Sequence, residues 1–120
     1  MIIITDGGKR DGVTYGSYKL LTDEGEEVAH RQIVHAANTS NEAEYLTLIS
    51  AIKKAKGLSN KNLTIILDSE LVAFQVEGQF NCYAENLRPL RDIVRNLLKE
   101  FDRYDFLLVK RNFIKQKLGH

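Results

Sequence analysis

Residues Met1–Gly8 read MIIITDGG, and this stretch decides how the rest of the chain is interpreted. Met1–Thr5 is an apolar run rich in β-branched residues, which is typical of a buried β-strand. Asp6, Gly7 and Gly8 are turn formers, so we expect the strand to stop there in a turn. The sequence therefore predicts a core strand with an aspartate at its carboxyl end.

Apolar periodicity divides the remainder of the chain into further strands and helices. We expect strands at Thr14–Leu21, Glu27–His35, Asn62–Leu67 and Tyr104–Lys110, and helices from Asn38–Asn41 to about Lys56, at Ser69–Glu77 and at Glu85–Phe101, with one or two helical turns in the tail. Strands joined by a turn pair antiparallel, whereas strands separated by a helix need a crossover. This order predicts an α/β fold, in which a three-stranded antiparallel meander plus parallel strands form a mixed five-stranded sheet flanked by helices.

The composition predicts one globular domain spanning residues 1–120. Of the 120 residues 43% are hydrophobic and 28% charged, and the net charge is +1. These values exclude a disordered chain, and no apolar run reaches the roughly 18 residues of a membrane span. The small net charge argues against nucleic-acid binding by bulk positive charge but leaves a local basic face open. Signal-peptide features are absent at the start and the single cysteine, Cys82, has no internal partner. We therefore expect a cytoplasmic monomer with no membrane contact and no obligatory protein partner.

Three carboxylates stand at positions that suggest a shared site. Asp6 and Asp68 each follow an apolar strand, and Glu44 lies near the start of the first long helix. The carboxyl ends of strands in an open α/β sheet form one edge, where ligands bind. Three close carboxylates repel, and an oxygen-only site suits Mg²⁺ or Mn²⁺ rather than Zn²⁺. Each residue also has an ordinary structural interpretation, as a turn former or as a complement to the helix dipole, and spacing alone leaves both interpretations open.

The residues around these carboxylates resemble the ribonuclease H type 1 family in its short form. Three motifs carry the resemblance, Ile4–Gly8 (ITDGG), Thr39–Tyr45 (TSNEAEY) and Leu67–Val72 (LDSELV), in the family's order and at its separations. The resemblance extends over about Ile2–Arg111. It implies the ribonuclease H fold and hydrolysis of the RNA strand of RNA–DNA hybrids, with two Mg²⁺ or Mn²⁺ ions expected when substrate is bound.

The resemblance also implies roles for individual residues. Asp6, Glu44 and Asp68 take the positions of catalytic metal ligands. Contacts to the hybrid are implied for Gly7, Gly8, Thr39, Ser40, Asn41 and Ser69. Short polar groups and backbone amides suit this role because they reach the 2′-hydroxyls across a shallow minor groove. Residues 39–41 are equally interpreted as caps of the helix that follows them.

The chain departs from the family pattern at its end. The family has a fourth acid on a C-terminal helix, whereas no Asp or Glu follows Asp105 here. When the family pattern is aligned from Arg111, the position of this acid falls on Leu118, and when it is aligned on Asn112, the position falls on Gln116. His120 is the available substitute, because an imidazole ligates metals and relays protons near neutral pH; otherwise it is a terminal residue without a role. Gln116 and Asn112 are weaker candidates.

Other features each have two interpretations. Nine basic residues either form a surface that contacts the phosphates of a nucleic acid or are ordinary solvated side chains. They are Lys9, Arg10, Arg88, Arg91, Arg95, Lys110, Arg111, Lys115 and Lys117. Phe80 and Tyr83 are expected to pack in the core or their loop rather than to contact a sugar or base. The missing fourth acid keeps a catalytically weak nucleic-acid-binding domain as an alternative function. A nuclease for double-stranded RNA or branched structures is the other alternative.

Overall fold

The computed structural model describes residues 1–59 and 61–119. Its centre is a five-stranded sheet in the order β3-β2-β1-β4-β5. The strands are β1 (Ile2–Arg10), β2 (Val13–Leu21), β3 (Glu27–His35), β4 (Asn62–Leu67) and β5 (Arg103–Leu108). β1, β2 and β3 pair antiparallel, and β4 pairs in parallel with β1 and with β5. This arrangement confirms the predicted mixed sheet of an antiparallel meander plus parallel strands.

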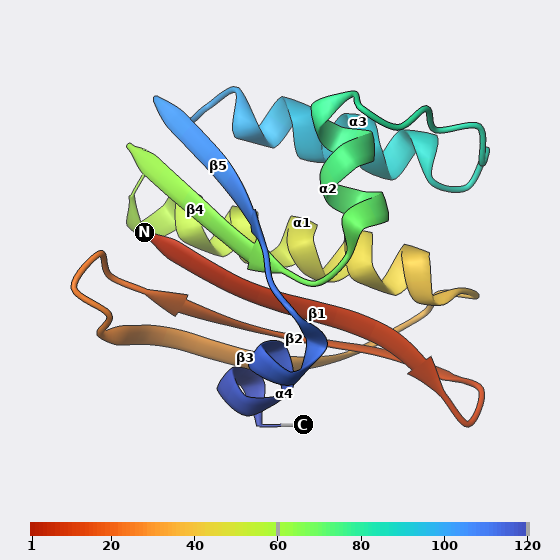
Figure 1. The fold of residues 1–120 in the computed structure, drawn as a ribbon, viewed down its shortest axis with the longest axis horizontal. Coiled ribbons are helices and arrows are strands. Elements are labelled where there is room, and N and C mark those ends of the chain that lie inside the picture. Colours follow the sequence, from red (N-terminus) through yellow and green to blue (C-terminus); the bar gives the residue numbers. More distant parts are fainter. Residues whose placement is uncertain (60, 120) are drawn as a thin grey trace.

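Helices cover the two faces of the sheet unequally (Figure 1). They are α1 (Ser40–Leu58), α2 (Glu70–Glu77), α3 (Arg88–Leu98) and α4 (Arg111–Leu118). α1, α2 and α3 pack on one face and share the main hydrophobic core with it, whereas α4 lies on the opposite face. None of the helices in the described part of the chain is long and apolar enough to cross a membrane.

β1 lies between these two cores. Ile3 faces the main core, and Ile4 packs with Ile114 and Leu118 of α4 in a smaller second core. Side chains alternate between the faces of a strand, so a strand buried on both faces needs a continuous apolar run. This double burial explains the apolar sequence at the start of the chain.

β1 continues past the point where we expected it to stop. Its parallel pairing with β4 extends only to Ile4, opposite Ile66, whereas its antiparallel pairing with β2 continues to Arg10, opposite Val13. The turn lies instead at Asp11 and Gly12, whose φ angles are 52° and 78°. The predicted turn at residues 6–8 is therefore wrong, because pairing with β2 overrides the local turn preference.

Candidate active site

Asp6 projects from the part of β1 where the sheet opens on one side. β4 leaves the pairing with β1 two residues before Asp6, while β2 still pairs with it through Ser17. Asp68 directly follows Leu67, the last residue of β4. The two aspartates therefore meet at the carboxyl ends of two parallel neighbours, which is the expected ligand-binding edge of such a sheet.

Glu44 reaches the same point from α1. Thr39 caps this helix, with its Oγ1 accepting a hydrogen bond from the Glu42 amide at 3.1 Å. The Glu42 carboxylate in turn accepts from the Asn38 amide at 3.3 Å, so Glu42 is the acid that complements the helix start. Glu44 is buried against β1. Complementing the helix dipole, the structural role that we considered for Glu44, is instead the role of Glu42.

A glycine allows α1 to approach the strand this closely. A Cβ atom placed on Gly7 would lie 2.6 Å from the carbonyl carbon of Ala43, so any larger residue would push the helix away. The Gly7 amide also donates a hydrogen bond to the Glu44 carboxyl group. Gly7 therefore positions Glu44 beside Asp6.

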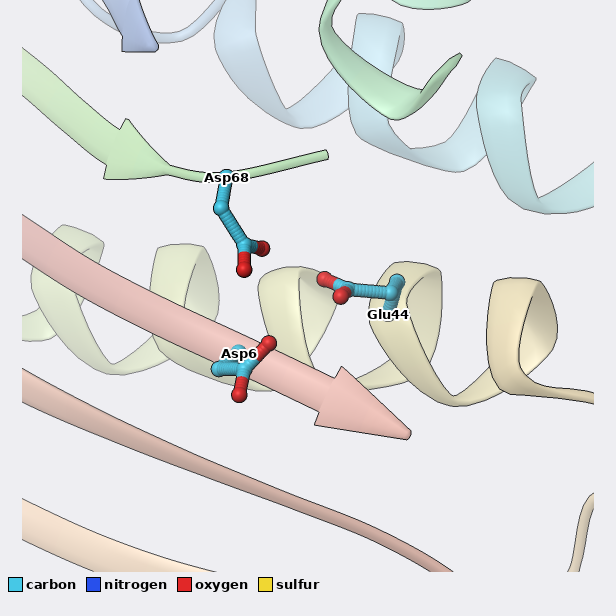
Figure 2. A group of neighbouring side chains, drawn as sticks. All are labelled: Asp6, Glu44 and Asp68. Carbon is cyan, nitrogen blue, oxygen red and sulfur yellow. The ribbon is translucent and has the colours of Figure 1, made fainter. Parts of the chain in front are cut away.

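The three carboxyl groups converge (Figure 2). One oxygen from each of Asp6, Glu44 and Asp68 lies within 4.8 Å of the others. Burial raises the pKa of Glu44 well above its usual range, and the negative charge of Asp6, a hydrogen bond to Asp6 and the charge of Asp68 raise it further. The cluster thus resists carrying its full negative charge unless a cation joins it.

This donor set fits a hard divalent cation. The ligands available are carboxylate oxygens only, which suit Mg²⁺ or Mn²⁺, and they already lie within the span of one coordination sphere. A bound cation would remove the repulsion that raises the pKa of Glu44. These residues could therefore hold the predicted metal.

Glu44 and Asp68 line a cleft of ≈ 290 Å³ whose walls also contain most of the residues expected to contact substrate, whereas Asp6 is not part of the lining. Among those residues the cleft is lined by Gly7, Gly8, Ser40, Asn41 and Ser69. Thr39 is outside this lining and acts as the cap of α1. Ser69 lines the cleft and also caps α2, because its Oγ accepts a hydrogen bond from the Val72 amide at 3.2 Å.

Three residues of the lining were not among the expected site residues. These are Lys9, Tyr15 and Arg111. Arg111 begins α4, and its Nη1 lies 3.5 Å from Oδ2 of Asp68. The signal available in the sequence was weak, because Lys9 and Arg111 were only two of several candidate basic residues and Tyr15 resembled any strand aromatic.

α4 presents a different surface to the cleft from the one that the family pattern implies. The first residue of the helix is the cation Arg111, and Leu118, one of the aligned positions for the fourth acid, is buried in the second core. Gln116 and Asn112 are exposed and absent from the cleft lining. His120, our candidate substitute, lies outside the described residues.

The basic residues of α3 have structural partners. Arg95 donates from Nε to the Val76 carbonyl and from Nη2 to the Gln75 carbonyl, both at 2.9 Å, at the end of α2. Arg91 pairs with Asp92 at 3.1 Å, and Arg88 donates to the Tyr83 carbonyl at 3.2 Å. These contacts favour the structural interpretation over a phosphate-tracking face on α3.

The two loop aromatics are more exposed than expected. Phe80 is 44% and Tyr83 81% exposed. Phe80 makes an edge contact with Phe74, with ring centroids 5.0 Å apart, and the Tyr83 hydroxyl accepts from Asn81 at 2.9 Å. Of the two placements that we expected, packing in the core is wrong, whereas the contacts with Phe74 and Asn81 agree with local packing around the loop before α3.

Comparison with known proteins identifies the family. A family model described as "Reverse transcriptase-like" matches residues 10–116. The chain belongs to this family. RNase H1 from the halophilic archaeon Halobacterium salinarum NRC-1 has the same fold, with a TM-score of 0.89 and 28% identity over 95% of this chain and 88% of that one. The chain thus has the ribonuclease H fold, as the three motifs implied.

Two further relatives add to this picture. LC11-RNase H1, solved in complex with an RNA/DNA hybrid, has a TM-score of 0.87 at 20% identity, covering 96% of this chain and 88% of its own, which shows a common fold. The bifunctional protein Rv2228c of Mycobacterium tuberculosis (strain ATCC 25618 / H37Rv) is 27% identical over 114 residues, which are 92% of this chain and 31% of that protein. The chain thus spans about a third of the length of the curated relatives it matches. The resemblance to ribonuclease H type 1 is confirmed.

Proposed function

We propose that this protein is a metal-dependent endonuclease that hydrolyses the RNA strand of RNA–DNA hybrids. The observation that carries the proposal is the convergence of Asp6, Glu44 and Asp68 within 4.8 Å, at a cleft that Glu44 and Asp68 line together with short polar groups. The fold shared with ribonucleases H1, one of them solved with an RNA/DNA hybrid, supports the substrate class.

The three carboxylates would hold two Mg²⁺ or Mn²⁺ ions around the scissile phosphate. Bound divalent metals supply Lewis-acid stabilisation of the phosphodiester and lower the pKa of a coordinated water. Asp6 on β1, Asp68 after β4 and Glu44 on α1 lie at the corners of a triangle, with their carboxyl groups near one another (Figure 2). Burial of Glu44 and Asp6 keeps the site in a low dielectric, where each charge contact is stronger.

The cleft walls would position the hybrid. Ser40, Asn41 and Ser69 offer side chains that both donate and accept hydrogen bonds. Such groups suit the 2′-hydroxyls that distinguish RNA from DNA. Arg111, at the same opening, adds a cation that faces incoming phosphate groups.

One observation favours a second candidate function. Within the described part of α4 no acidic side chain faces the cleft, and Leu118 is buried at one of the aligned positions of the fourth acid. A centre with three carboxylates and one arginine would bind metal less strongly than one with four carboxylates. This favours, as the alternative, a nucleic-acid-binding domain with weak catalysis.

Cleavage assays separate these functions. We expect the protein to cut an end-labelled RNA–DNA hybrid with Mg²⁺ or Mn²⁺, to leave 5′-phosphate and 3′-hydroxyl ends, and to lose the activity in Asp68→Asn. Duplex RNA and branched DNA, tested in parallel, would identify the alternative nuclease specificities. Hybrid binding by folded protein without turnover under either metal would contradict the proposed function and leave the binding domain.

A further inference from the structure

A second hollow adjoins the carboxylate cleft on the sheet face that carries α4. We call it the side pocket; it has a volume of ≈ 470 Å³ and includes Arg10, Tyr15, Gln32 and Val34 in its lining. Tyr15 lines both the side pocket and the cleft, so the two hollows meet at this ring. The side pocket therefore lies next to the candidate active site, with Tyr15 bordering both.

The position of α4 leaves this part of the sheet open. The buried residues of α4 pack around Ile4, toward the start of β1, whereas Arg10 is the last residue of that strand. Val34, near the end of the edge strand β3, is 77% exposed. An exposed apolar side chain beside an aromatic ring and a hollow provides a surface on which a ligand can pack.

The chemistry of the side pocket matches that of a nucleotide strand. The Arg10 guanidinium carbon lies 5.8 Å from the centre of the Tyr15 ring, which places a cation and an aromatic ring side by side. Gln32 adds an amide that donates and accepts hydrogen bonds. No acidic side chain occurs among the described residues of the lining. Bases and sugars pack on aromatic rings while arginine contacts the phosphates, and this combination is common in nucleic-acid binding.

We propose that the side pocket binds the strand being cut, at nucleotides adjacent to the scissile phosphate, with Arg10 contacting a phosphate and Tyr15 packing against a sugar or base. This inference rests on the proposed function, because a strand lying across the carboxylates has to pass Tyr15 to enter the pocket. A protein segment is less suited as an occupant, because the cation of the lining, Arg10, shares the pocket with Tyr15, which also borders the proposed phosphate site.

Hybrid binding, measured without turnover, tests this placement. In an Asp68→Asn background, binding of a hybrid that fills only the cleft is compared with binding of hybrids extended to one side or the other. We expect extension to one side to increase affinity, and Val34→Asp to reduce the affinity for that extended hybrid about tenfold through repulsion of the phosphates. Arg10→Ala should lower the slope of log affinity against log salt by about 0.9, the value for one lost phosphate contact.

Two matched variants control for charge alone. Val28→Asp adds the same charge at the other end of β3, and Arg103→Ala removes a cation at the amino end of β5, away from the cleft. Both should bind the extended hybrid as the background protein does. If Val34→Asp and Arg10→Ala also match these controls while the unmodified protein cuts hybrids, the side-pocket inference alone is overturned. If the unmodified protein neither binds nor cuts hybrids, the proposed function fails and the inference fails with it.

Discussion

Two sets of like charges in this molecule are handled in opposite ways. The carboxylates of Asp6, Glu44 and Asp68 are brought within 4.8 Å of one another. Each arginine of α3, by contrast, contacts a carbonyl or carboxylate of its own. Charges with individual partners stabilise the fold, whereas like charges gathered in a buried cleft are unfavourable until a ligand of opposite charge binds. This contrast supports our proposal that the carboxylate cluster is the functional site.

The largest effect is expected from the carboxylates. Asp6→Asn preserves the size of the side chain and removes one charge from the cluster. Cleavage of the hybrid should fall by at least about 1000-fold, since metal stabilisation worth several kcal/mol is lost. Initial rates with Mg²⁺ measure this effect, with circular dichroism confirming the fold. A matched charge removal on α3, Arg91→Ala, should leave the rate close to that of the parent; equal rates for both variants would contradict the contrast.

The reverse pattern is expected for stability. Arg95→Ala removes two charge-assisted hydrogen bonds to the end of α2 and should lower the free energy of unfolding by about 2 kcal/mol. Arg91→Ala removes an ion pair with Asp92, whose side chain is 57% exposed, and should cost less than about 1 kcal/mol. Urea denaturation distinguishes the two. An Arg95→Ala variant as stable as the parent would show that the hydrogen bonds between Arg95 and the end of α2 contribute little to the stability of the fold.

Arg111 links the two sets, because it is an arginine that contacts a carboxylate of the cluster. Its side chain is 56% exposed and its Nη1 lies 3.5 Å from Asp68. At this distance, and screened by water, the guanidinium weakens the free energy of metal binding by about 1 kcal/mol. Arg111→Ala should therefore raise Mn²⁺ affinity by about fivefold in a calorimetric titration. A lower affinity would instead indicate that Arg111 orients Asp68 for the metal.

The smallest expected effect is a pH dependence of stability at His35, a partly buried residue whose ring is hydrogen-bonded. Its Nε2 lies 2.7 Å from the Thr47 hydroxyl, and burial, together with the charge of Arg31, lowers its pKa. The folded state then binds protons less readily than the unfolded chain. The stability contributed by the neutral ring is complete above the unfolded pKa of 6.5 and decreases as the pH falls through that value.

Urea denaturation between about pH 7.5 and pH 5.5 measures this dependence. The parent should lose more stability on acidification than His35→Gln, whose side chain at this position does not titrate. Identical pH profiles for parent and variant would show that the ring does not contribute to the pH dependence.

The order of elements could be predicted because each has a local signal. Alternation indicates the strands at 13–21 and 27–35, and the apolar run at 62–67 indicates β4. The continuation of β1 through Asp6 could not be predicted in this way. Residues 6–8 have the composition of a turn, and only their pairing with β2 and the approach of α1 to Gly7 keep them extended. A tertiary contact here overrides a local preference.

The same distinction applies to the site. Asp6, Glu44 and Asp68 could be suggested from their places at the ends of elements, and the three motifs added the family resemblance. Arg111 could not be assigned from its neighbours, because its contact with Asp68 depends on how α4 crosses the opposite face of the sheet. Tyr15 likewise gains its place in two hollows from the geometry of β1 and β2. Local sequence carries little information about such long-range contacts.

The most direct test of the central claim is a calorimetric Mn²⁺ titration of the parent and Glu44→Gln. The variant retains the shape of the buried side chain but not its negative charge. We predict saturable Mn²⁺ binding by the parent, with an increase in its melting temperature, and binding weaker by at least about tenfold in Glu44→Gln. Equal binding by the two proteins, or none by the folded parent, would contradict the assignment of the carboxylate cluster as a metal centre.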